Sequence, residues 1–409
     1  MLVGSYAPDL EGGAERQCRL LSKFLTDRGD TVGVIAPRHS IHRGEIEANN
    51  CIRLYGFGRL GIFAHTSVRT FDSWMLSTFP SQDSLSADRY ERRRRAFSFW
   101  LTLPAVWLAR LDFLIMLRRF VSHHSHAFDI LHVHESGWLA GVGVHLGRLW
   151  KIPVICKEST TPALCPIGFD TPFRCTLDRR RKMADAWIAP TPAMQDELHT
   201  LGIPKDRIHL LPNGVLMPLD MASPEGSSEV IYVGNLTQGA TWKAFDVLFD
   251  AWACVAKTRS DAHLTVVGGG DRTPWIRSLR HKGVGSSVHF TGHQKDLSQT
   301  YRTAGIFVLP SRVEGMSNAL LEAMSWGLPC VVSDIPGNRS VIDHEVDGLI
   351  VPVNNASALA EAILRLLNNS EIRSSLGYQA RKKIESQYDI HHVANELIEI
   401  YYTLINQKM

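Results

Sequence analysis

The sequence lacks the features that mark several large classes of protein. Its seven cysteines form no Cys-x-x-Cys pair, so the common dithiol redox and thiolate zinc motifs are excluded. Its 44 Lys and Arg residues are almost balanced by 41 Asp and Glu residues, which gives a net charge of +3. The chain therefore has no overall basic field of the kind that would indicate nucleic acid as a partner. The chain has no low-complexity tract and no short-period repeat, which excludes fibrous and repeat architectures.

Motifs for metals, dinucleotides and secretion are also missing. The histidines near the middle of the first half have neither Cys partners nor His-Glu-x-x-His spacing, so we expect no metal site. Gly268-Gly269-Gly270 lacks the Gly-x-Gly-x-x-Gly spacing of dinucleotide oxidoreductases. An odd number of cysteines without a signal peptide favours a reducing compartment, and we expect a cytoplasmic protein. The histidines in question are His123, His124, His126, His132 and His134.

One stretch is apolar enough to raise the question of a membrane. Residues 97–120 follow the basic run Arg92–Arg95. Pro104 interrupts the stretch, and Arg110 and Asp112 lie near its middle, where charges in hydrocarbon are costly, so a spanning helix is disfavoured. Two interpretations stay open: helices inside a domain, which we favour, or an amphipathic face that rests on lipid beside a basic patch.

The composition is that of a globular protein with more than one domain. With 409 residues, 44% hydrophobic and 21% charged, the chain should form two or three domains with substantial cores. Short apolar runs alternate with segments of helical period, the pattern of strand-crossover-strand units in parallel sheets. The expected strands are 1–5, 31–36, 51–55, 129–134, 153–157, 186–190 and 207–211, followed by a second series at 230–234, 263–268, 288–292, 306–310, 330–334 and 349–353.

The two series predict an α/β fold with two doubly wound parallel-sheet domains. The turn at Leu211–Gly214 and the polar stretch that follows it to Ser228 read as their connection. Parallel sheets bind ligands beyond the carboxyl ends of their strands, so two such domains should face one central cleft. Residues 356–407 predict two or three helices. The first strand is short, which suggests that the natural chain begins further upstream.

Residues 310–329 carry the most informative pattern, a strand end, a loop and a helix. Ser317 or Asn318 is a suitable N-cap, and Gly327 ends the helix. The unpaired amides at such a helix start favour a phosphate, and the small residues Gly315 and Ser317 allow a ligand to approach the backbone. Glu314 and Glu322 bracket this site and could accept hydrogen bonds from vicinal hydroxyls, each worth roughly 1.5–3 kcal/mol. Alternatively, they are an ordinary turn residue and an exposed helix residue.

The spacing Glu314-x7-Glu322, followed by GLPCVVSDIPGNRSVI and DGLIVP, resembles the signature of glycosyltransferase family 4, whose members are retaining enzymes of the GT-B fold. The resemblance covers nearly the whole chain in order. Its further matches are GGAERQ at 12–17, LLPNGV at 210–215, Tyr232-Val233-Gly234 with Lys243, and LTVVGGG at 264–270.

The resemblance implies an activity and a domain plan. The enzyme would move a sugar, without a metal, from a UDP- or GDP-linked donor to an acceptor hydroxyl, and the leaving phosphate would take the acceptor proton. Residues 1–212 would form the acceptor-side domain, 213–385 the nucleotide-sugar domain, and 386–409 a helix that could cross back to the first domain. The acceptor would be a glycan or lipid-linked molecule in cell-surface polysaccharide or glycolipid assembly, with peripheral contact at the inner face of the membrane.

The resemblance also assigns roles to single residues. Glu322 would bind the ribose, Glu314 the donor sugar and Lys243 the diphosphate, where charge develops on the leaving group. The remaining substrate contacts would come from Gly12 and Gly13 at the start of the first helix, from His134 at the end of a strand, and from Gly315, Met316, Ser317 and Asn318.

Three positions depart from the family pattern. Asn235 stands where an Arg is usual, Ala244 stands where a Gly is usual after Lys243, and Lys157 stands near the place of a His and could replace it at the donor's reacting end. Two other functions therefore stay open: a nucleotide-sugar epimerase of the 2-epimerase kind, or a non-catalytic nucleotide-sugar binding protein. The sequence names neither the base, the sugar, the acceptor nor the oligomeric state.

Overall fold

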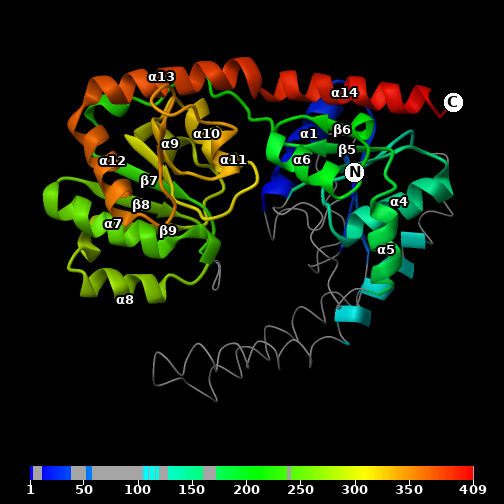
Figure 1. Ribbon diagram of the computed structural model, residues 1–409, viewed down its shortest axis with the longest axis horizontal. Helices are drawn as coiled ribbons and strands as arrows, with labels where there is room; N and C mark the ends of the chain where they lie inside the picture. The colour runs from blue at the N-terminus through cyan, green and yellow to red at the C-terminus, as the bar shows by residue number, and fades with distance from the viewer. Residues whose placement is uncertain are drawn as a thin grey trace. The chain divides into compact units, whose positions relative to one another are not determined.

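The computed structural model describes residues 1–2, 12–37, 52–57, 128–159, 172–236 and 241–408, and most of residues 104–118 (Figure 1). The chain forms two compact units. Unit 1 comprises Met1–Ala189, Glu197–His209 and Leu397–Met409. Unit 2 comprises Pro190–Asp196 and Leu210–Glu396.

Unit 1 is built on a parallel sheet. Leu2 forms parallel bridges with Ile35 and with Val133, so it links the two groups of strands, one that holds β1 and β2 and one that holds β3 to β6. The pairs β1–β2, β3–β4 and β4–β5 are parallel. The strands are β1 (Val32–Pro37), β2 (Ile52–Phe57), β3 (Leu131–Val133), β4 (Val154–Lys157), β5 (Ala186–Ala189) and β6 (Ile208–Leu210).

Helices pack against this sheet through small residues and an apolar stripe. Cys18, Leu21 and Leu25 recur at helical spacing on the first helix and are buried. A Cβ added at Gly143 of α4 (Trp138–Trp150) would lie 2.4 Å from Val133 on the sheet, so only glycine allows this approach. The helices of unit 1 are α1 (Gly13–Asp27), α4 (Trp138–Trp150) and α5 (Arg174–Arg181), with a 3₁₀ turn η1 (Lys205–Arg207). Helix α6 (Pro192–Thr200) begins in unit 2, and its residues from Glu197 onward belong to unit 1.

Unit 2 holds a six-stranded sheet in the order β12-β11-β10-β7-β8-β9, and its neighbouring strands are parallel. This is the doubly wound order of Rossmann-like domains, and its direction reverses between β7 and β10. The strands are β7 (Glu229–Val233), β8 (His263–Val267), β9 (Val288–Gly292), β10 (Ile306–Leu309), β11 (Cys330–Ser333) and β12 (Leu349–Val351).

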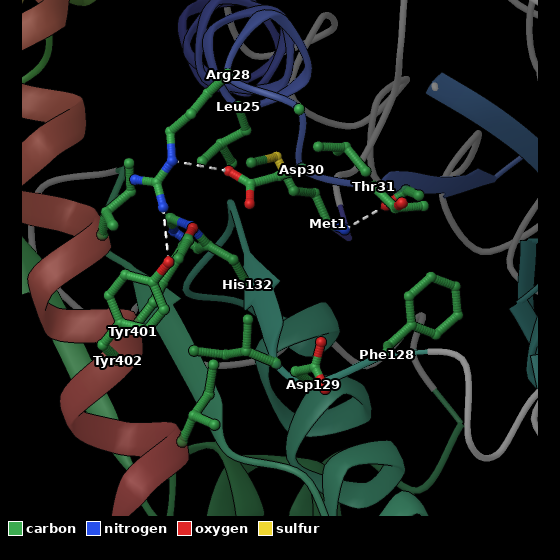
Figure 2. Close-up of a pocket in the computed structure, with 16 residues that line it drawn as sticks. Met1, Leu25, Arg28, Asp30, Thr31, Phe128, Asp129, His132, Tyr401 and Tyr402 are labelled. Atoms are coloured by element: carbon green, nitrogen blue, oxygen red, sulfur yellow. Dashed lines mark hydrogen bonds and ion pairs between the residues drawn. The ribbon is translucent and has the colours of Figure 1, made fainter. Parts of the chain in front are cut away.

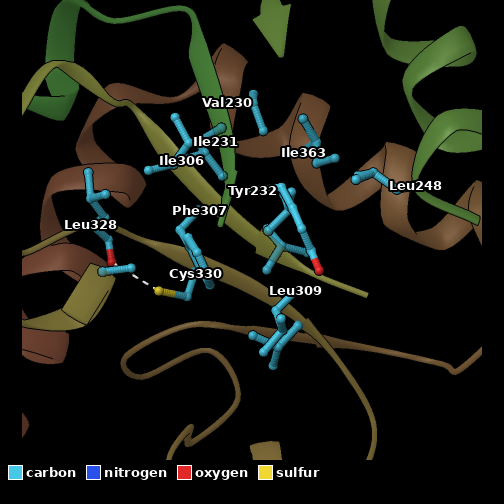
Figure 3. Close-up of a cluster of buried hydrophobic side chains, with 14 of the residues drawn as sticks. Val230, Ile231, Tyr232, Leu248, Ile306, Phe307, Leu309, Leu328, Cys330 and Ile363 are labelled. Carbon is cyan, nitrogen blue, oxygen red and sulfur yellow. Dashed lines mark hydrogen bonds between the residues drawn. The ribbon is translucent and has the colours of Figure 1, made fainter. Parts of the chain in front are cut away.

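Helices cover both faces of the second sheet, which explains why β10 and β11 are buried at every residue. Leu248 and Ile363, from two neighbouring helices, belong to the same buried cluster as Tyr232 and Phe307 of the sheet (Figure 3). The helices of unit 2 are α7 (Phe245–Thr258), α8 (Thr273–His281), α9 (Ser298–Thr303), α10 (Asn318–Ser325), α11 (Pro336–Arg339), α12 (Ala356–Asn368) and α13 (Ser370–Gln387). Helix α14 (Ile390–Asn406) begins in unit 2, and its residues from Leu397 onward belong to unit 1. Three short 3₁₀ turns are η2 (Pro224–Gly226), η3 (Thr241–Lys243) and η4 (Gly285–Ser287).

The predicted α/β class with two doubly wound parallel sheets is confirmed. Most strand bounds agree with the prediction to within one or two residues. Of the predicted first strand only Met1 and Leu2 lie in the described part, and the basic run Arg92–Arg95 and the residues His123, His124 and His126 lie outside it. Within the ranges that the structure describes, no helix is both long and apolar enough to cross a bilayer.

Candidate functional site

The reversal of strand order in unit 2 brings two loops together. The loop after β7 begins with Gly234 and Asn235, and the loop after β10 runs through Glu314 to the start of α10. In open parallel sheets, ligands bind outside the carboxyl ends of the strands at such a switch point. The predicted unit 2 site residues therefore lie where this class of fold places a ligand.

Glu314 and Lys243 form an ion pair at this point. The Lys243 ammonium donates to Glu314 Oε1 at 2.7 Å, and the Ser311 hydroxyl donates to the same oxygen at 2.8 Å. The side chain of Glu314 is 13% exposed and that of Lys243 is 24% exposed. The carboxylate and the ammonium are thus oriented and remain within reach of a ligand.

Arg312 holds the short segment that carries Lys243. Its backbone amide donates to Trp242 O at 2.6 Å, and its guanidinium donates to Asp246 at 3.0 and 2.6 Å. The guanidinium also donates to Thr241 O at 2.5 Å. Hydrogen bonding from Arg312 lowers the pKa of the Asp246 carboxyl. Arg312 thereby connects the loop after β10 to η3 and to the start of α7.

The start of α10 is fixed by two side chains. The Ser317 hydroxyl caps the helix by accepting from Leu320 N at 3.4 Å, as the sequence predicts. The Asn213 amide donates to Met316 O at 3.2 Å and to Asn318 Oδ1 at 3.0 Å. The Gly315 carbonyl lies so close to Gly337 that a Cβ there would be 1.9 Å away. These contacts therefore hold the backbone from Gly315 to Asn318 in one conformation.

Glu322 is buried rather than exposed. It is 8% exposed, and its Oε2 accepts from the Tyr301 hydroxyl at 3.1 Å. The Tyr301 ring stacks on Trp326, with ring centroids 6.4 Å apart. The interpretation of Glu322 as an ordinary exposed helix residue is therefore wrong, because this carboxylate is oriented by a buried hydroxyl.

Asn235 takes part in a tight backbone junction. Its Oδ1 accepts from Gly269 N at 3.2 Å. Gly268 and Gly270 have positive φ angles of 153° and 120° and pack against the carbonyls of Gly234 and Leu236. The GGG segment is thus a close crossing of two backbones, and Asn235 joins its two sides.

Two predicted residues of unit 1, His134 and Lys157, lie at the carboxyl ends of β3 and β4, and two others lie at the start of α1. Gly12 is the N-cap of α1, and Gly13 is its first residue. His134 follows β3 and is 1% exposed, and its ring stacks on His132 at 4.1 Å. Burial and the charge of Lys157 lower the pKa of both imidazoles. His132 Nδ1 lies 2.5 Å from the Tyr401 hydroxyl.

Lys157, the last residue of β4, is 5% exposed. Burial lowers the pKa of its ammonium to about 8, and the nearby Cys18 opposes the shift. Its charge therefore titrates close to neutral pH, which is a property found at functional sites as well as in structural networks.

Glu135 was not singled out from the sequence and lies beside His134. Burial raises the pKa of its carboxyl to about 7, while Arg110 and the backbone amide of Leu139 favour the ionised form. Gly137, the N-cap of α4, offers no capping side chain. Glu135 therefore satisfies one of the free amides at the start of α4.

A cavity of about 490 Å³ lies elsewhere in unit 1 (Figure 2). Thr31 and Ile130, which precede β1 and β3, line it together with Arg28, Tyr401 and Tyr402. It opens at the amino ends of these strands, whereas the predicted site residues follow the carboxyl ends. We therefore do not place the reaction there.

Several contacts of the site could not be read from the sequence. Ser311, Asn213, Tyr301 and Arg312 position the predicted residues, and Asn213 stood out only as part of a turn signal and of the family match LLPNGV, without a role at the site. In the described part of the chain, no group of three or more metal-ligating side chains gathers.

Two family models match the chain in succession. The model for Glycosyltransferase Family 4 matches residues 11–216, half of the chain, and the model for Glycosyl transferases group 1 matches residues 227–369. The chain belongs to glycosyltransferase family 4. The resemblance read from its motifs is confirmed.

Individual relatives of this family 4 protein are distant. An uncharacterized glycosyltransferase of Haemophilus influenzae is 29% identical over 45% of this chain, and the match spans about half (52%) of that relative. The N,N'-diacetylbacillosaminyl-diphospho-undecaprenol alpha-1,3-N-acetylgalactosaminyltransferase of Campylobacter jejuni is 34% identical over 35% of this chain and 38% of its own length.

A solved structure matches almost the full length. HepE of Anabaena, crystallised with UDP-glucose, superimposes with a TM-score of 0.69 at 16% identity, over 98% of this chain and 99% of that one. This likeness shows the GT-B fold. Family and fold together identify a glycosyltransferase of the GT-B type.

Proposed function

We propose that the protein transfers a sugar, with retention of anomeric configuration and without a metal, from a UDP- or GDP-linked donor to an acceptor hydroxyl. One observation carries the proposal: Lys243, Glu314 and Ser311 form a hydrogen-bonded cluster at the switch point of unit 2, beside the start of α10. A cation, the start of a helix and an oriented carboxylate suit a molecule that carries both phosphate and hydroxyl groups.

Each part of the donor has a matching group in unit 2. Lys243 and the amides from Gly315 to Asn318 bind the diphosphate, and Glu322, oriented by Tyr301, accepts from the ribose diol. Glu314 accepts from hydroxyls of the transferred sugar. Asn235 adds a hydrogen bond where family members have a cation, so Lys243 neutralises a larger part of the diphosphate charge.

The chemistry asks little covalent work of the protein. The bond between the anomeric carbon and the leaving phosphate oxygen breaks as the acceptor oxygen bonds to the same face. The acceptor proton passes to the leaving phosphate. Lys243 and the amides at the start of α10 stabilise the charge that develops on the diphosphate. This role is metal-independent, because an ammonium and backbone dipoles supply the compensating charge.

Unit 1 completes the proposal. The resemblance to the family assigns Lys157 to the reacting end of the donor, His134 to the acceptor, and Gly12 and Gly13 to the diphosphate or acceptor. The cleft between the two domains stays a prediction from the sequence.

The acceptor that we propose is a glycan or a lipid-linked molecule in cell-surface polysaccharide or glycolipid assembly. The name of the Campylobacter relative, which specifies a diphospho-undecaprenol acceptor, supports a lipid-linked one. UDP-sugars are the first donors to test, because HepE was crystallised with UDP-glucose. We place the protein in the cytoplasm, in peripheral contact with the inner face of the membrane.

The test is incubation with UDP-, GDP- and ADP-sugars, each with and without glycan and polyprenyl-diphosphate acceptors, while free nucleotide is measured and the anomeric coupling of the product is read by NMR. Glu314→Gln should abolish transfer without changing the melting temperature. Glu361→Gln, an exposed glutamate of α12, is the matched control. Conversion of the donor sugar without an acceptor would identify an epimerase instead, and binding without nucleotide release a non-catalytic protein.

A further inference from the structure

The described residues between positions 104 and 118 form a helical segment with two contrasting faces. Phe113 and Leu117, four residues apart, are 2% and 1% exposed. Leu108 and Ile115, seven residues apart and thus on one side of a helix, are 53% and 48% exposed. Trp107 lies beside this outer stripe at 37% exposure. The segment therefore buries one apolar face and presents another.

The buried face packs on α4. The Phe113 ring meets the Trp138 ring edge-on at 5.8 Å, and the Arg110 guanidinium lies 5.2 Å from the centre of the same ring. Trp138 is the first residue of α4. The orientation of the segment is thus set by the start of α4, and the outer stripe turns away from it.

The exposed face continues onto α5. The rings of Trp107 and Phe173 lie 6.4 Å apart, and Phe173, the N-cap of α5, is 63% exposed. Helices α4 and α5 pack side by side (Figure 1), closely enough that a Cβ at Gly141 would lie 2.4 Å from the Leu177 carbonyl. Three helices of unit 1 therefore share one surface, and aromatic side chains stand out from one end of it.

Arginines gather at the other end of the same three helices. Arg118 from the helical segment, Arg148 from α4 and Arg180 from α5 all act on His145, whose pKa they lower together with burial. Arg148 also donates to Met183 Sδ at 3.3 Å, just beyond α5. Asp178, the acidic residue of α5, pairs at 2.5 Å with the buried Arg181 and so offsets little of this charge. Cations from three elements thus gather around His145, at the opposite end of the three helices from the aromatic side chains.

We propose that this basic-apolar face, formed by Trp107, Leu108, Phe173, Arg118, Arg148 and Arg180, docks unit 1 on a bilayer that contains anionic phospholipid. The aromatic and aliphatic side chains enter the interfacial region, and the arginines bind lipid phosphates. The charge complementarity favours an anionic lipid surface over an uncharged apolar partner. The proposal deepens the proposed function, because it names the surface that brings the enzyme to a lipid-linked acceptor.

The test is flotation of the full-length protein with vesicles of phosphatidylcholine alone or with 30 mol% phosphatidylglycerol, a composition chosen as about that of an anionic membrane. We expect binding to the anionic vesicles that weakens as salt is raised. Arg148→Glu with Arg180→Glu should reduce this binding by at least about tenfold. Arg277→Glu with Arg280→Glu, exposed arginines of α8 in unit 2, should leave it unchanged.

A second pair of variants tests the apolar part. Trp107→Gln with Phe173→Asn should abolish flotation, and asparagine tolerates the left-handed backbone at position 173 (φ 57°). Equal melting temperatures would show that both pairs fold. Equal binding to both vesicle types, or normal flotation of the arginine pair, would overturn the proposal. Because vesicle binding is measured without donor, and transfer to a water-soluble acceptor is assayed without vesicles, failure of one proposal is distinguishable from failure of the other.

Discussion

Individual carboxylates in unit 2 are oriented by hydroxyl groups of other residues. Glu314 accepts from Ser311 in its own loop, and Glu322 accepts from Tyr301 of α9. Both carboxylates are therefore held before a ligand binds, which lowers the entropy lost on binding. Substitutions of single residues should therefore affect the free energy of unfolding and the binding of the donor to different extents.

Ala244 occupies a backbone conformation that suits glycine. It lies in the left-handed region, at φ 53° and ψ 42°, and is the N-cap of α7. We expect Ala244→Gly to raise the free energy of unfolding by about 0.5–1 kcal/mol, because the left-handed conformation penalises a Cβ and glycine is the better N-cap. Urea denaturation measures the change. Ala256→Gly, inside the same helix, should have the opposite sign; a loss of stability at both positions would contradict the argument.

Lys157 should give the activity an alkaline limit. Because burial lowers its pKa to about 8, the ammonium loses its proton as the pH rises through that value. If the cation contacts the donor, kcat/KM for the donor falls above pH 8, by about tenfold per pH unit at most. Lys157→Gln should be less active, with a profile flat from about pH 7 to 9.5. An alkaline limb that survives in this variant would assign it to another group.

Glu135 should make stability depend on pH. Its pKa is raised by burial to about 7 in the folded chain, so the folded state binds the proton more tightly than the unfolded state. The resulting stability is complete below the ordinary pKa of a glutamate and is lost as the pH rises to 7. The difference is at most about 3 kcal/mol. We therefore compare the unfolding free energy of Glu135→Gln with that of the natural protein at two pH values. The difference in favour of the variant should be larger at pH 8 than at pH 5, as urea titrations would show.

At the scale of elements, Arg312 connects the loop after β10 to η3 and α7. It contacts Asp246 and the carbonyls of Thr241 and Trp242. We expect Arg312→Ala to raise KM for the donor by roughly tenfold, because the segment that carries Lys243 loses its anchor. Steady-state kinetics and melting curves measure the effect. Arg365→Ala, which removes an exposed pair with Glu345, is the control, and an equal rise in KM there would refute the positioning role.

The elements themselves could be predicted because their signals are local. The strand, cap, apolar stripe and glycine of residues 306–327 all lie within one window, and the structure confirms Ser317 as the cap of α10. The partners of the site are distant in sequence instead. Asn213 reaches Asn318 across 105 residues. No pattern within a window reports such contacts, because sheet order brings them together.

At the scale of the whole chain, the last residues, Leu397–Met409, belong to unit 1 although the residues before them belong to unit 2. Tyr401 contacts His132 at 2.5 Å, and the Lys408 ammonium lies 3.1 Å from Asp185. The alternation of strands and helices predicted both sheets, but not which helix residues would pack with which unit. The resemblance to the family predicted that residues 386–409 could cross back to the first domain, but the contacts that hold them there join residues more than 200 positions apart.

Variants of two neighbouring tyrosines would show how much the end of the chain contributes to the stability of unit 1. Tyr401 is 8% exposed and Tyr402 is 49% exposed. We expect Tyr401→Phe to lower the free energy of unfolding by about 1–3 kcal/mol, because it leaves the buried His132 Nδ1 without its partner. Tyr402→Phe, which removes an exposed bond from Arg28, should cost less than about 0.5 kcal/mol. Equal effects in denaturant titrations would show that His132 does not depend on this contact.

The pair of Lys243 and Glu314 also affects which molecules can enter the site. The two charges already neutralise each other at 2.7 Å. In the function that we propose, a nucleotide sugar would therefore bind by exchange: its diphosphate would replace Glu314 as the partner of the ammonium, and a sugar hydroxyl would replace Lys243 as the partner of the carboxylate. A free nucleotide or a free sugar would offer only one of these replacements, so the other member of the ion pair would lose its partner. The proposed site would thus select against a ligand that carries only the nucleotide or only the sugar. Only a molecule that carries both parts would give each of the two side chains a new partner.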